Sequence, residues 1–320
     1  MLTRKIYPNC YHTFRKWISN NKEYMDIYNK LGYPIPFDVT LRDGLQGLSK
    51  EEQEKYKTNK KLDMYDNIMK KHNVKNIEIG SIASEKILPI FNDTMILYDY
   101  IDLKQKWYEP YVKTNNYVLV PNEKKLDNII NTNINHYSLI TSVSDNFQLK
   151  NTKMNLDQSD NEIKKILCKL NEKYNNDKDK YNIKLYVSCI NECPIDGKID
   201  NDFIVNRLLK LNNMDVNIIC LSDTCGSLNI EDFEYIIDTC YYFGLQFKNL
   251  SLHLHVNPNN ESEVVKIIHK ALDYGIINFD VSALDTGGCS ITIDKNKLLP
   301  NLSYNLYYKS LCDYIEKKTI

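Results

Sequence analysis

Eight short apolar runs alternate with longer amphipathic stretches along this chain, and that alternation constrains the fold more than any other feature. The runs hold four to seven residues each and are rich in β-branched and aromatic side chains. This composition is typical of parallel strands that are buried on both faces. The runs are Ile35–Leu41, Val74–Ile79, Tyr117–Val120, Tyr137–Val143, Ile183–Cys189, Val216–Leu221, Leu250–Val256 and Ile276–Val281.

The stretches between these runs have helical length and helical apolar spacing. Clear examples are Lys60–His72, Glu162–Tyr174, Asp202–Leu211, Glu231–Phe243 and Ser262–Tyr274. Eight strand-then-helix units predict a (β/α)8 TIM barrel over residues 35–320, with residues 1–34 as an N-terminal extension. A doubly wound open sheet is the structural alternative, but no GxGxxG sequence follows a strand here. A barrel places its active site at the carboxyl ends of the strands.

Charge and hydropathy exclude several classes of protein. The 41 basic and 42 acidic side chains give a net charge of −1, which argues against a nucleic-acid-binding protein. No apolar stretch approaches the roughly 18 residues of a membrane span, and the first 30 residues contain no apolar signal-peptide core. We therefore expect no membrane association, a cytoplasmic location, and nine cysteines in the reduced state.

Polar and titratable side chains collect where the predicted strands end. His253 and His255 form an HxH pair, and residues two apart on a strand point to the same face. Asp43 follows the first strand, which lies beside the eighth strand and near the seventh in a closed barrel. Two imidazoles and a carboxylate suit a divalent cation such as Zn, Mn, Fe or Mg.

Four further residues are candidates for catalysis. Arg42 could hold an oxyanion or pair with a carboxylate, and Glu78 is an expected buried partner for it. Asp223 could orient the metal site, take a proton or cap a helix. Cys289 follows two glycines in a loop able to close over a ligand, where a thiol can serve as acid or base or remain inert.

In their order along the chain, these motifs resemble the metal-dependent TIM-barrel lyases and synthases with an Arg-Asp-Gly motif, the superfamily of pyruvate carboxyltransferase-type domains. The likeness is greatest to the 3-hydroxy-3-methylglutaryl-CoA lyases, and it runs from about Pro34 to about Leu311. The matching segments are Arg42–Gln46, Val120–Asn122, Tyr186–Ile199, Ser222–Gly226, His253 with His255, and Gly287–Cys289. Tyr186–Ile199, of the form YVSCxxxCPxxGKI, is the most specific of them.

The resemblance implies retro-Claisen cleavage of 3-hydroxy-3-methylglutaryl-CoA, or a related 3-hydroxyacyl-CoA, to acetyl-CoA and acetoacetate. It implies a divalent cation, Mg or Mn, an acyl-CoA or small organic acid as substrate, and a homodimer. The implied metal ligands are Asp43, His253, His255 and Asn301. The implied substrate-binding residues are Arg42 and Gln46, and the implied catalytic residues are Arg42, Glu78, Asp223, His253 and Cys289.

The chain departs from the lyase pattern at several positions. Val256 follows the HxH pair where the lyases have an Asp, which predicts the loss of a residue that orients the metal ligands. Asn305 stands where they have a helical Glu, and the Cys289 loop lacks an extra Gly and a Pro. Two alternatives therefore stay open. One is another reaction of the superfamily, namely cleavage of a 4-hydroxy-2-oxo acid or an acyl-CoA condensation. The other is a catalytically decayed barrel that acts as a binding protein.

Overall fold

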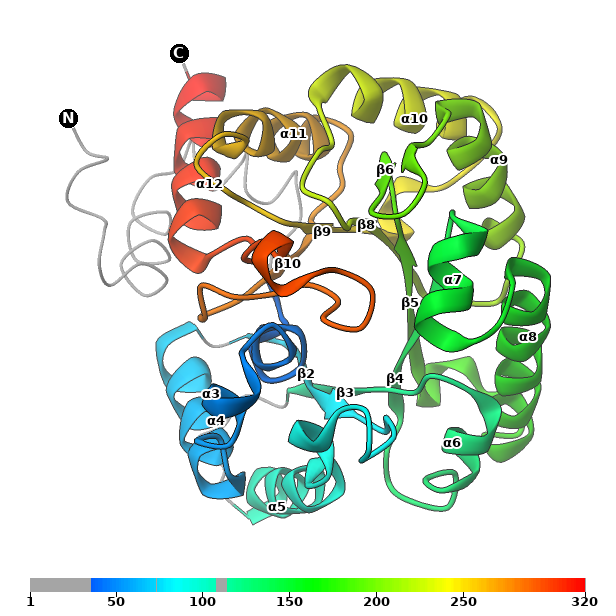
Figure 1. The fold of residues 1–320 in the computed structure, drawn as a ribbon, viewed down its shortest axis with the longest axis vertical. Helices are drawn as coiled ribbons and strands as arrows, with labels where there is room; N and C mark the ends of the chain where they lie inside the picture. The colour runs from blue at the N-terminus through cyan, green and yellow to red at the C-terminus, as the bar shows by residue number, and fades with distance from the viewer. Residues whose placement is uncertain (1–35, 73, 108–113, 320) are drawn as a thin grey trace.

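Eight parallel strands close into a barrel in the computed structural model, which describes residues 36–319 except 73 and 108–113 (Figure 1). Around the barrel the strand order is β1-β10-β9-β8-β5-β4-β3-β2. The strands are β1 (Phe37–Asp38), β2 (Asn76–Ser81), β3 (Asn115–Leu119), β4 (His136–Ser142), β5 (Asn182–Ser188), β8 (Ile218–Asp223), β9 (Leu250–Leu254) and β10 (Asn278–Val281). The prediction of a (β/α)8 barrel is confirmed. The predicted extension, residues 1–34, lies outside the described residues.

Helices surround the barrel on its outer side (Figure 1). They are α3 (Lys50–Gln53), α4 (Thr58–His72), α5 (Thr94–Trp107), α6 (Glu123–Asp127), α7 (Asp145–Thr152), α8 (Leu156–Lys173), α9 (Asn201–Asn212), α10 (Ile230–Tyr242), α11 (Glu261–Asp273) and α12 (Tyr304–Thr319). Short polar side chains cap the amino ends of several helices by accepting a hydrogen bond from a backbone N–H of the first turn. Ser144, Asp200 and Asn229 do so for α7, α9 and α10. None of the helices within the described ranges is long and apolar enough to cross a membrane.

The first strand is shorter than the sequence predicts. Only Phe37 and Asp38 pair with β10 on one side and β2 on the other. Thr40–Gly44 then forms a π-helical turn, in which the Gly44 amide donates to the Val39 carbonyl at 3.1 Å. This turn carries Arg42 and Asp43 over the open end of the barrel, so these residues belong to a tight turn rather than to a strand.

A small hairpin follows β5, formed by β6 (Glu192–Cys193) and β7 (Gly197–Lys198). It lies within the Tyr186–Ile199 segment and is an element that strand patterning did not predict. Cys193 accepts hydrogen bonds at its sulfur from the Ile195 and Asp196 amides. Together with its contact to Cys189, these bonds lower the pKa of Cys193 to about 6. The eight cysteines of the described residues are all free.

The barrel has an apolar outer layer and a partly polar interior. The helices pack apolar side chains such as Leu208, Ile237 and Ile267 against the strands. Charged side chains, among them Lys184 and Asp280, point inward and are fully buried. Burying a charge is costly unless it is paired, and these interior charges pair below the site described next.

Candidate active site

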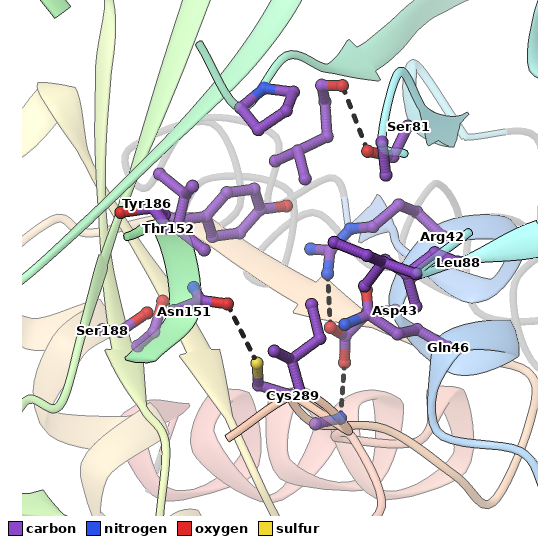
Figure 2. Close-up of a pocket in the computed structure, with 18 of the residues that line it drawn as sticks. Arg42, Asp43, Gln46, Ser81, Leu88, Asn151, Thr152, Tyr186, Ser188 and Cys289 are labelled. Atoms are coloured by element: carbon purple, nitrogen blue, oxygen red, sulfur yellow. Dashed lines mark hydrogen bonds and ion pairs between the residues drawn. The ribbon is translucent and has the colours of Figure 1, made fainter. Parts of the chain in front are cut away.

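A cavity of about 390 Å³ opens at the carboxyl ends of the barrel strands. This volume lies within the range typical of small-molecule sites. Figure 2 shows Arg42, Asp43 and Gln46 on one side of it and Tyr186, Ser188 and Asn151 on the other, with Cys289 between them. Residues far apart in the sequence therefore share one pocket at the end of the barrel where this fold carries its chemistry.

Asp43, His253 and His255 form a buried cluster at the floor of this cavity. One ligand atom from each lies within 4.8 Å of the others. Asp43 Oδ2 is 3.8 Å from His253 Nε2 and 4.0 Å from His255 Nε2. Three nitrogen and oxygen donors converging in this way are the minimal protein part of a divalent metal site.

Hydrogen bonds at Nδ1 fix the orientation of both imidazoles. His253 Nδ1 lies 3.0 Å from Asp280 Oδ2, and His255 Nδ1 lies 2.9 Å from the Asp223 carbonyl oxygen. Both partners can only accept, so Nδ1 carries the proton and the Nε2 lone pair points toward Asp43. Burial lowers the pKa of His255 to about 4, which keeps its imidazole neutral and able to ligate at neutral pH.

Two polar atoms at the cluster are buried without a hydrogen-bond partner among the described residues. They are His255 Nε2 and Asn301 Oδ1. Asn301 pairs with His255 in a backbone bridge, and its Nδ2 donates to the Thr286 carbonyl at 3.2 Å, which turns Oδ1 away from that bond. Unpartnered buried acceptors require an explanation, and a cation between them supplies one. These residues therefore fit a divalent metal ion.

Arg42 lies between the cluster and the barrel interior. Its Nε donates to Glu78 Oε2 at 2.6 Å, and Nη1 forms an ion pair with Asp43. The Tyr186 hydroxyl donates to the same Glu78 oxygen at 3.0 Å. Burial alone would lower the pKa of Arg42, but Glu78 and Asp43 raise it well above its usual value. Arg42 thus remains charged and is held in place from two sides.

The charges buried beneath the cavity do not balance. Arg42 and Lys184 are cationic, whereas Asp43, Glu78 and Asp280 are their anionic partners. Leaving the two imidazoles out of the count, this group carries one surplus negative charge, and burial of unpaired charge is strongly unfavourable. Burial opposes ionisation of Asp43, yet the Arg42 guanidinium beside it holds the pKa of Asp43 well below the usual range. The surplus is a second reason to expect a bound cation here.

Cys289 lies on the loop that covers the cluster. The neighbouring Gly288 amide donates to Asp43 Oδ2 at 2.9 Å, and Cys289 Sγ lies 3.4 Å from Asn151 Oδ1. The loop approaches so closely that a Cβ on Gly287 would lie 2.5 Å from Asn301 Nδ2. Burial raises the pKa of the Cys289 thiol, so the thiol stays protonated at neutral pH.

The side chain of every candidate except Asp223 and Glu78 either lines the cavity or contacts the cluster of Asp43, His253 and His255. Glu78 accepts a hydrogen bond from Arg42 on the side away from the cavity, so it is the buried partner that was expected. The Asp223 carboxylate accepts from the Ser227 and Leu228 amides, and this residue reaches the site through its carbonyl oxygen. Burial raises the pKa of Asp223 to about 7. Its side chain therefore faces a loop rather than the cavity.

Sequence reasoning missed Asp280, Lys184 and Tyr186 as site residues. Each is buried and contacts a candidate or the partner of one. The sequence did contain a signal for Lys184 and Asp280, because a charged residue inside an apolar run of a predicted barrel strand is expected to point into the barrel. Val256 replaces an acidic residue of the lyase pattern, but the two histidines are still oriented, because Asp280 and the Asp223 carbonyl hold their Nδ1 atoms.

Comparisons with known proteins agree with this geometry. A family model described as HMGL-like matches residues 34–288. A hydroxymethylglutaryl-CoA lyase of Bacillus subtilis is 25% identical over 263 residues, covering 80% of each chain. One from Pseudomonas mevalonii is 23% identical over 171 residues, covering 53% of this chain and 54% of that protein.

Solved structures of similar proteins share the fold. A hydroxymethylglutaryl-CoA lyase from Pseudomonas aeruginosa superposes with a TM-score of 0.72 at 20% identity, covering 88% of this chain and 86% of that one. An HMG-CoA lyase from Acinetobacter baumannii, in complex with coenzyme A and 3-methylmalate, gives 0.70 at 21% identity, covering 90% and 86%.

Proposed function

This chain belongs to the HMGL-like family, and on that premise we propose that it is a divalent-metal-dependent carbon–carbon lyase that cleaves 3-hydroxy-3-methylglutaryl-CoA or a related 3-hydroxyacyl-CoA. The observation that carries the proposal is the buried Asp43, His253 and His255 cluster beside Arg42, with an unpartnered acceptor on His255. Mg or Mn as the metal and a cytoplasmic location are parts of the same proposal.

The metal would be held by Asp43, His253, His255 and Asn301. A divalent cation at this place would supply Lewis-acid stabilisation of negative charge on substrate oxygens. Its positive charge would also compensate the surplus negative charge of the barrel interior. Asp280 and the Asp223 carbonyl are positioning groups, because they hold the two imidazoles with Nε2 toward Asp43 and would thereby keep them ready to ligate a cation.

Arg42 stabilises the charge that develops during cleavage. A water molecule in the cavity would take the 3-hydroxyl proton. That oxygen then becomes a carbonyl as the bond between C2 and C3 breaks, and the electron pair of this bond moves onto the thioester as an enolate. A guanidinium held by Glu78 and Asp43 needs no reorganisation to donate to the enolate oxygen. Gln46, buried at the same wall of the cavity, lies where it can contact the acyl group.

Cys289 is placed to return a proton to the enolate carbon. A thiol whose pKa is raised by burial is a proton donor rather than a nucleophile at neutral pH. Protonation of C2 completes acetyl-CoA beside the acetoacetate that the cleavage formed, and the Cys289 thiolate takes back the proton that the water received. The glycine-rich loop that carries Cys289 is tied to Asp43 through the Gly288 amide, which keeps the thiol over the metal ligands.

The rim of the cavity suits a substrate that bears phosphate groups. Lys125, Lys150 and Lys153 all line it. Lys125 and Lys150 also donate to backbone carbonyls, of Ala83 at 3.2 Å and of Thr292 at 3.1 Å, so their ammonium groups are held in place. Lysine is a common ligand of phosphate, and coenzyme A carries a pyrophosphate and a 3′-phosphate. This rim supports the acyl-CoA over a free oxo acid as substrate.

A turnover assay tests the proposal. Purified protein with Mg or Mn and a thiol reductant is given 3-hydroxy-3-methylglutaryl-CoA, and acetyl-CoA and acetoacetate are both measured. We expect Arg42→Gln to lower kcat by roughly 10²–10³-fold, as loss of an oxyanion donor does. Cys289→Ser should also lower kcat, whereas Cys168→Ser, at an exposed cysteine on α8, should not.

Three results would count against the proposal. Metal binding without turnover would favour a different substrate, a 4-hydroxy-2-oxo acid or an acyl-CoA that condenses. Absence of both metal binding and turnover would favour a barrel that has lost catalysis and acts as a binding protein. Turnover that is unchanged in Arg42→Gln would remove the assigned role of the guanidinium.

A further inference from the structure

The wall of the cavity across from Arg42 is formed by the end of β8. In the barrel order β8 lies four strands from β2, so Ser222 of β8 is opposite Glu78 of β2 and the guanidinium that Glu78 holds. Figure 2 shows Ser188, the last residue of the neighbouring strand β5, also on the far side of the cavity from Arg42. This wall therefore presents hydroxyl groups, whereas the wall that faces it presents a cation.

The Ser222 hydroxyl has no nitrogen or oxygen partner among the described residues. Ser222 is 5% exposed, and its Oγ is buried. The Cys220 thiol lies below it on the same strand, but sulfur is a weak hydrogen-bonding partner. Thr224, by contrast, is engaged, because its Oγ1 accepts from the Cys189 amide at 2.7 Å. Of the cavity-lining residues in the part of the chain that the structure describes, only Ser222 and His255 have such an unpartnered buried atom.

Ser222 stands beside the proposed metal ligands. It pairs with His253 in the ladder between β8 and β9, and paired residues of neighbouring strands point to the same face of a sheet, with the strands about 5 Å apart. The Ser222 hydroxyl therefore lies next to the imidazole whose Nε2 faces Asp43. A ligand oxygen that meets this hydroxyl would lie close to the cluster of Asp43, His253 and His255.

We propose that Ser222 is a specificity-determining residue, whose hydroxyl donates to a carboxylate at the far end of the acyl group. The inference rests on the proposed lyase function, in which the thioester oxygen lies at Arg42 and the 3-oxygen at the metal cluster. The part of the acyl group beyond C3 then reaches the β8 wall. An acyl group that ended there in a methyl group would leave the Ser222 hydroxyl buried and unpaired, which lowers affinity. The substrate class is therefore a coenzyme A thioester of a 3-hydroxydicarboxylic acid.

The charges around the cavity favour a carboxylate over a neutral group at this place. The buried side chains of Arg42, Lys184, Asp43, Glu78 and Asp280 together carry one surplus negative charge. A divalent cation, which the site fits, would turn this surplus into one positive charge. A carboxylate at Ser222 would cancel that charge, whereas a neutral end group would leave it buried without compensation.

The stability of the metal-free protein tests whether the Ser222 hydroxyl has a structural role instead. A buried hydroxyl without a partner does not stabilise the fold, so Ser222→Ala should unfold at the same Tm as wild type or at a higher one. Thr224→Val is the contrasting variant and should lower Tm, because it removes the acceptor of a buried backbone N–H. A Tm that falls as far in Ser222→Ala as in Thr224→Val would overturn the proposal.

Calorimetric binding in the presence of Mn²⁺ tests the ligand without relying on turnover. The probes are two thioethers of coenzyme A, in which a CH2 group replaces the thioester carbonyl so that no enolate can form. One carries the 3-hydroxy-3-methylglutaryl chain, and the other has a methyl group in place of its carboxymethyl group. We expect Ser222→Ala to bind the carboxylate probe about 10–100-fold more weakly than wild type and the methyl probe within about twofold, because only the first loses a hydrogen bond to a charged group.

The matched control is Ser251→Ala on β9. The Ser251 hydroxyl is also buried without a nitrogen or oxygen partner among the described residues, but it does not line the cavity. This variant should bind both probes as wild type does. A loss of carboxylate binding in Ser251→Ala equal to that in Ser222→Ala would show an indirect effect on the barrel interior and overturn the proposal.

Turnover of 3-hydroxy-3-methylglutaryl-CoA by the same variants separates this inference from the proposed function. A fall in kcat/KM in Ser222→Ala together with selective loss of the carboxylate probe supports both. Absence of turnover together with that selective loss would support the role of Ser222 and remove the lyase activity. Equal weakening of both probes, unchanged binding in Ser222→Ala, or a wild type that binds neither probe would overturn the role of Ser222.

Discussion

Replacing Asp280 with Asn would remove one negative charge from the barrel interior while keeping the shape of the side chain. The carboxylate has two partners, since Oδ1 pairs with Lys184 and Oδ2 accepts the Nδ1 proton of His253 at 3.0 Å. An amide has a single acceptor. If its oxygen faces Lys184, its NH2 group faces His253, and the imidazole proton must move to Nε2, where it blocks metal ligation.

The size of the effect follows from these two contacts. Loss of a residue that orients a metal ligand commonly lowers metal affinity about 10–100-fold. Breaking a buried ion pair from one side typically costs about 3–5 kcal/mol, because the remaining charge is left buried without a partner. Both partners here are almost fully buried. We therefore expect Asp280→Asn to bind metal about 10–100-fold more weakly and to have a free energy of unfolding lower by about 3–5 kcal/mol.

Two measurements on metal-free protein separate the effects. Titration with Mn²⁺ followed by electron paramagnetic resonance gives the affinity, and urea unfolding gives the stability. Adding Lys184→Met should recover both, because the amide oxygen is then free to accept from His253 and no buried ammonium group is left without its carboxylate. An Mn²⁺ affinity within twofold of wild type in Asp280→Asn, or a double variant no better than the single one, would refute this reasoning.

Three further predictions concern other parts of the molecule. Burial raises the pKa of Asp38 to about 6, so the stability that the protonated carboxyl contributes is lost as the pH rises through 6. The Tyr304 hydroxyl donates to the Asp38 carboxylate at 2.6 Å, and removing that hydroxyl should raise the pKa of Asp38 further. Tyr304→Phe should therefore destabilise by about 1.5–3 kcal/mol at pH 8 and by less at pH 5, as urea unfolding at the two pH values will show. Gly47→Ala would place a Cβ 2.5 Å from the Gly287 amide nitrogen, and we expect a loss of about 1–3 kcal/mol with reduced turnover from the displaced loop. Mg or Mn at a hundredfold excess over Kd should raise Tm by roughly 4 °C in the wild type and not in His255→Ala, as measured by calorimetry.

Most of the fold was predictable because each strand and helix is encoded locally. The run Ile183–Cys189 predicted β5, observed at Asn182–Ser188, and Lys60–His72 predicted α4, observed at Thr58–His72. The exception is instructive. Leu41 continues the apolar run of the first strand, but the chain leaves the sheet after Asp38 and winds into a π-helical turn. Apolar periodicity records burial, and Leu41 is as buried in the turn as it would be in a strand.

The site was predictable only where its residues form motifs. The HxH pair lies at the end of β9 and the Arg42–Asp43 step comes soon after β1, so closure of the barrel brings them together. Lys184 and Asp280 are 96 residues apart in the sequence, and they pair across the barrel interior. A single sequence does not show which side chains of different strands meet there. The backbone carbonyl of Asp223 as the partner of His255 has no side-chain signature at all.

The proposed metal ligands sit on the seam where the barrel closes. β1 joins the last strand to the second through only two residues, and Asp43 lies in the turn that follows it. His253, His255 and Asn301 come from the final quarter of the chain. During synthesis the first ligand emerges more than two hundred residues before the others, so a partly made chain has no site. Metal binding would then favour only the finished, closed barrel, and the cation would stabilise the closure at β1, the shortest of the eight barrel strands described. A chain that loses its metal should open first at this seam.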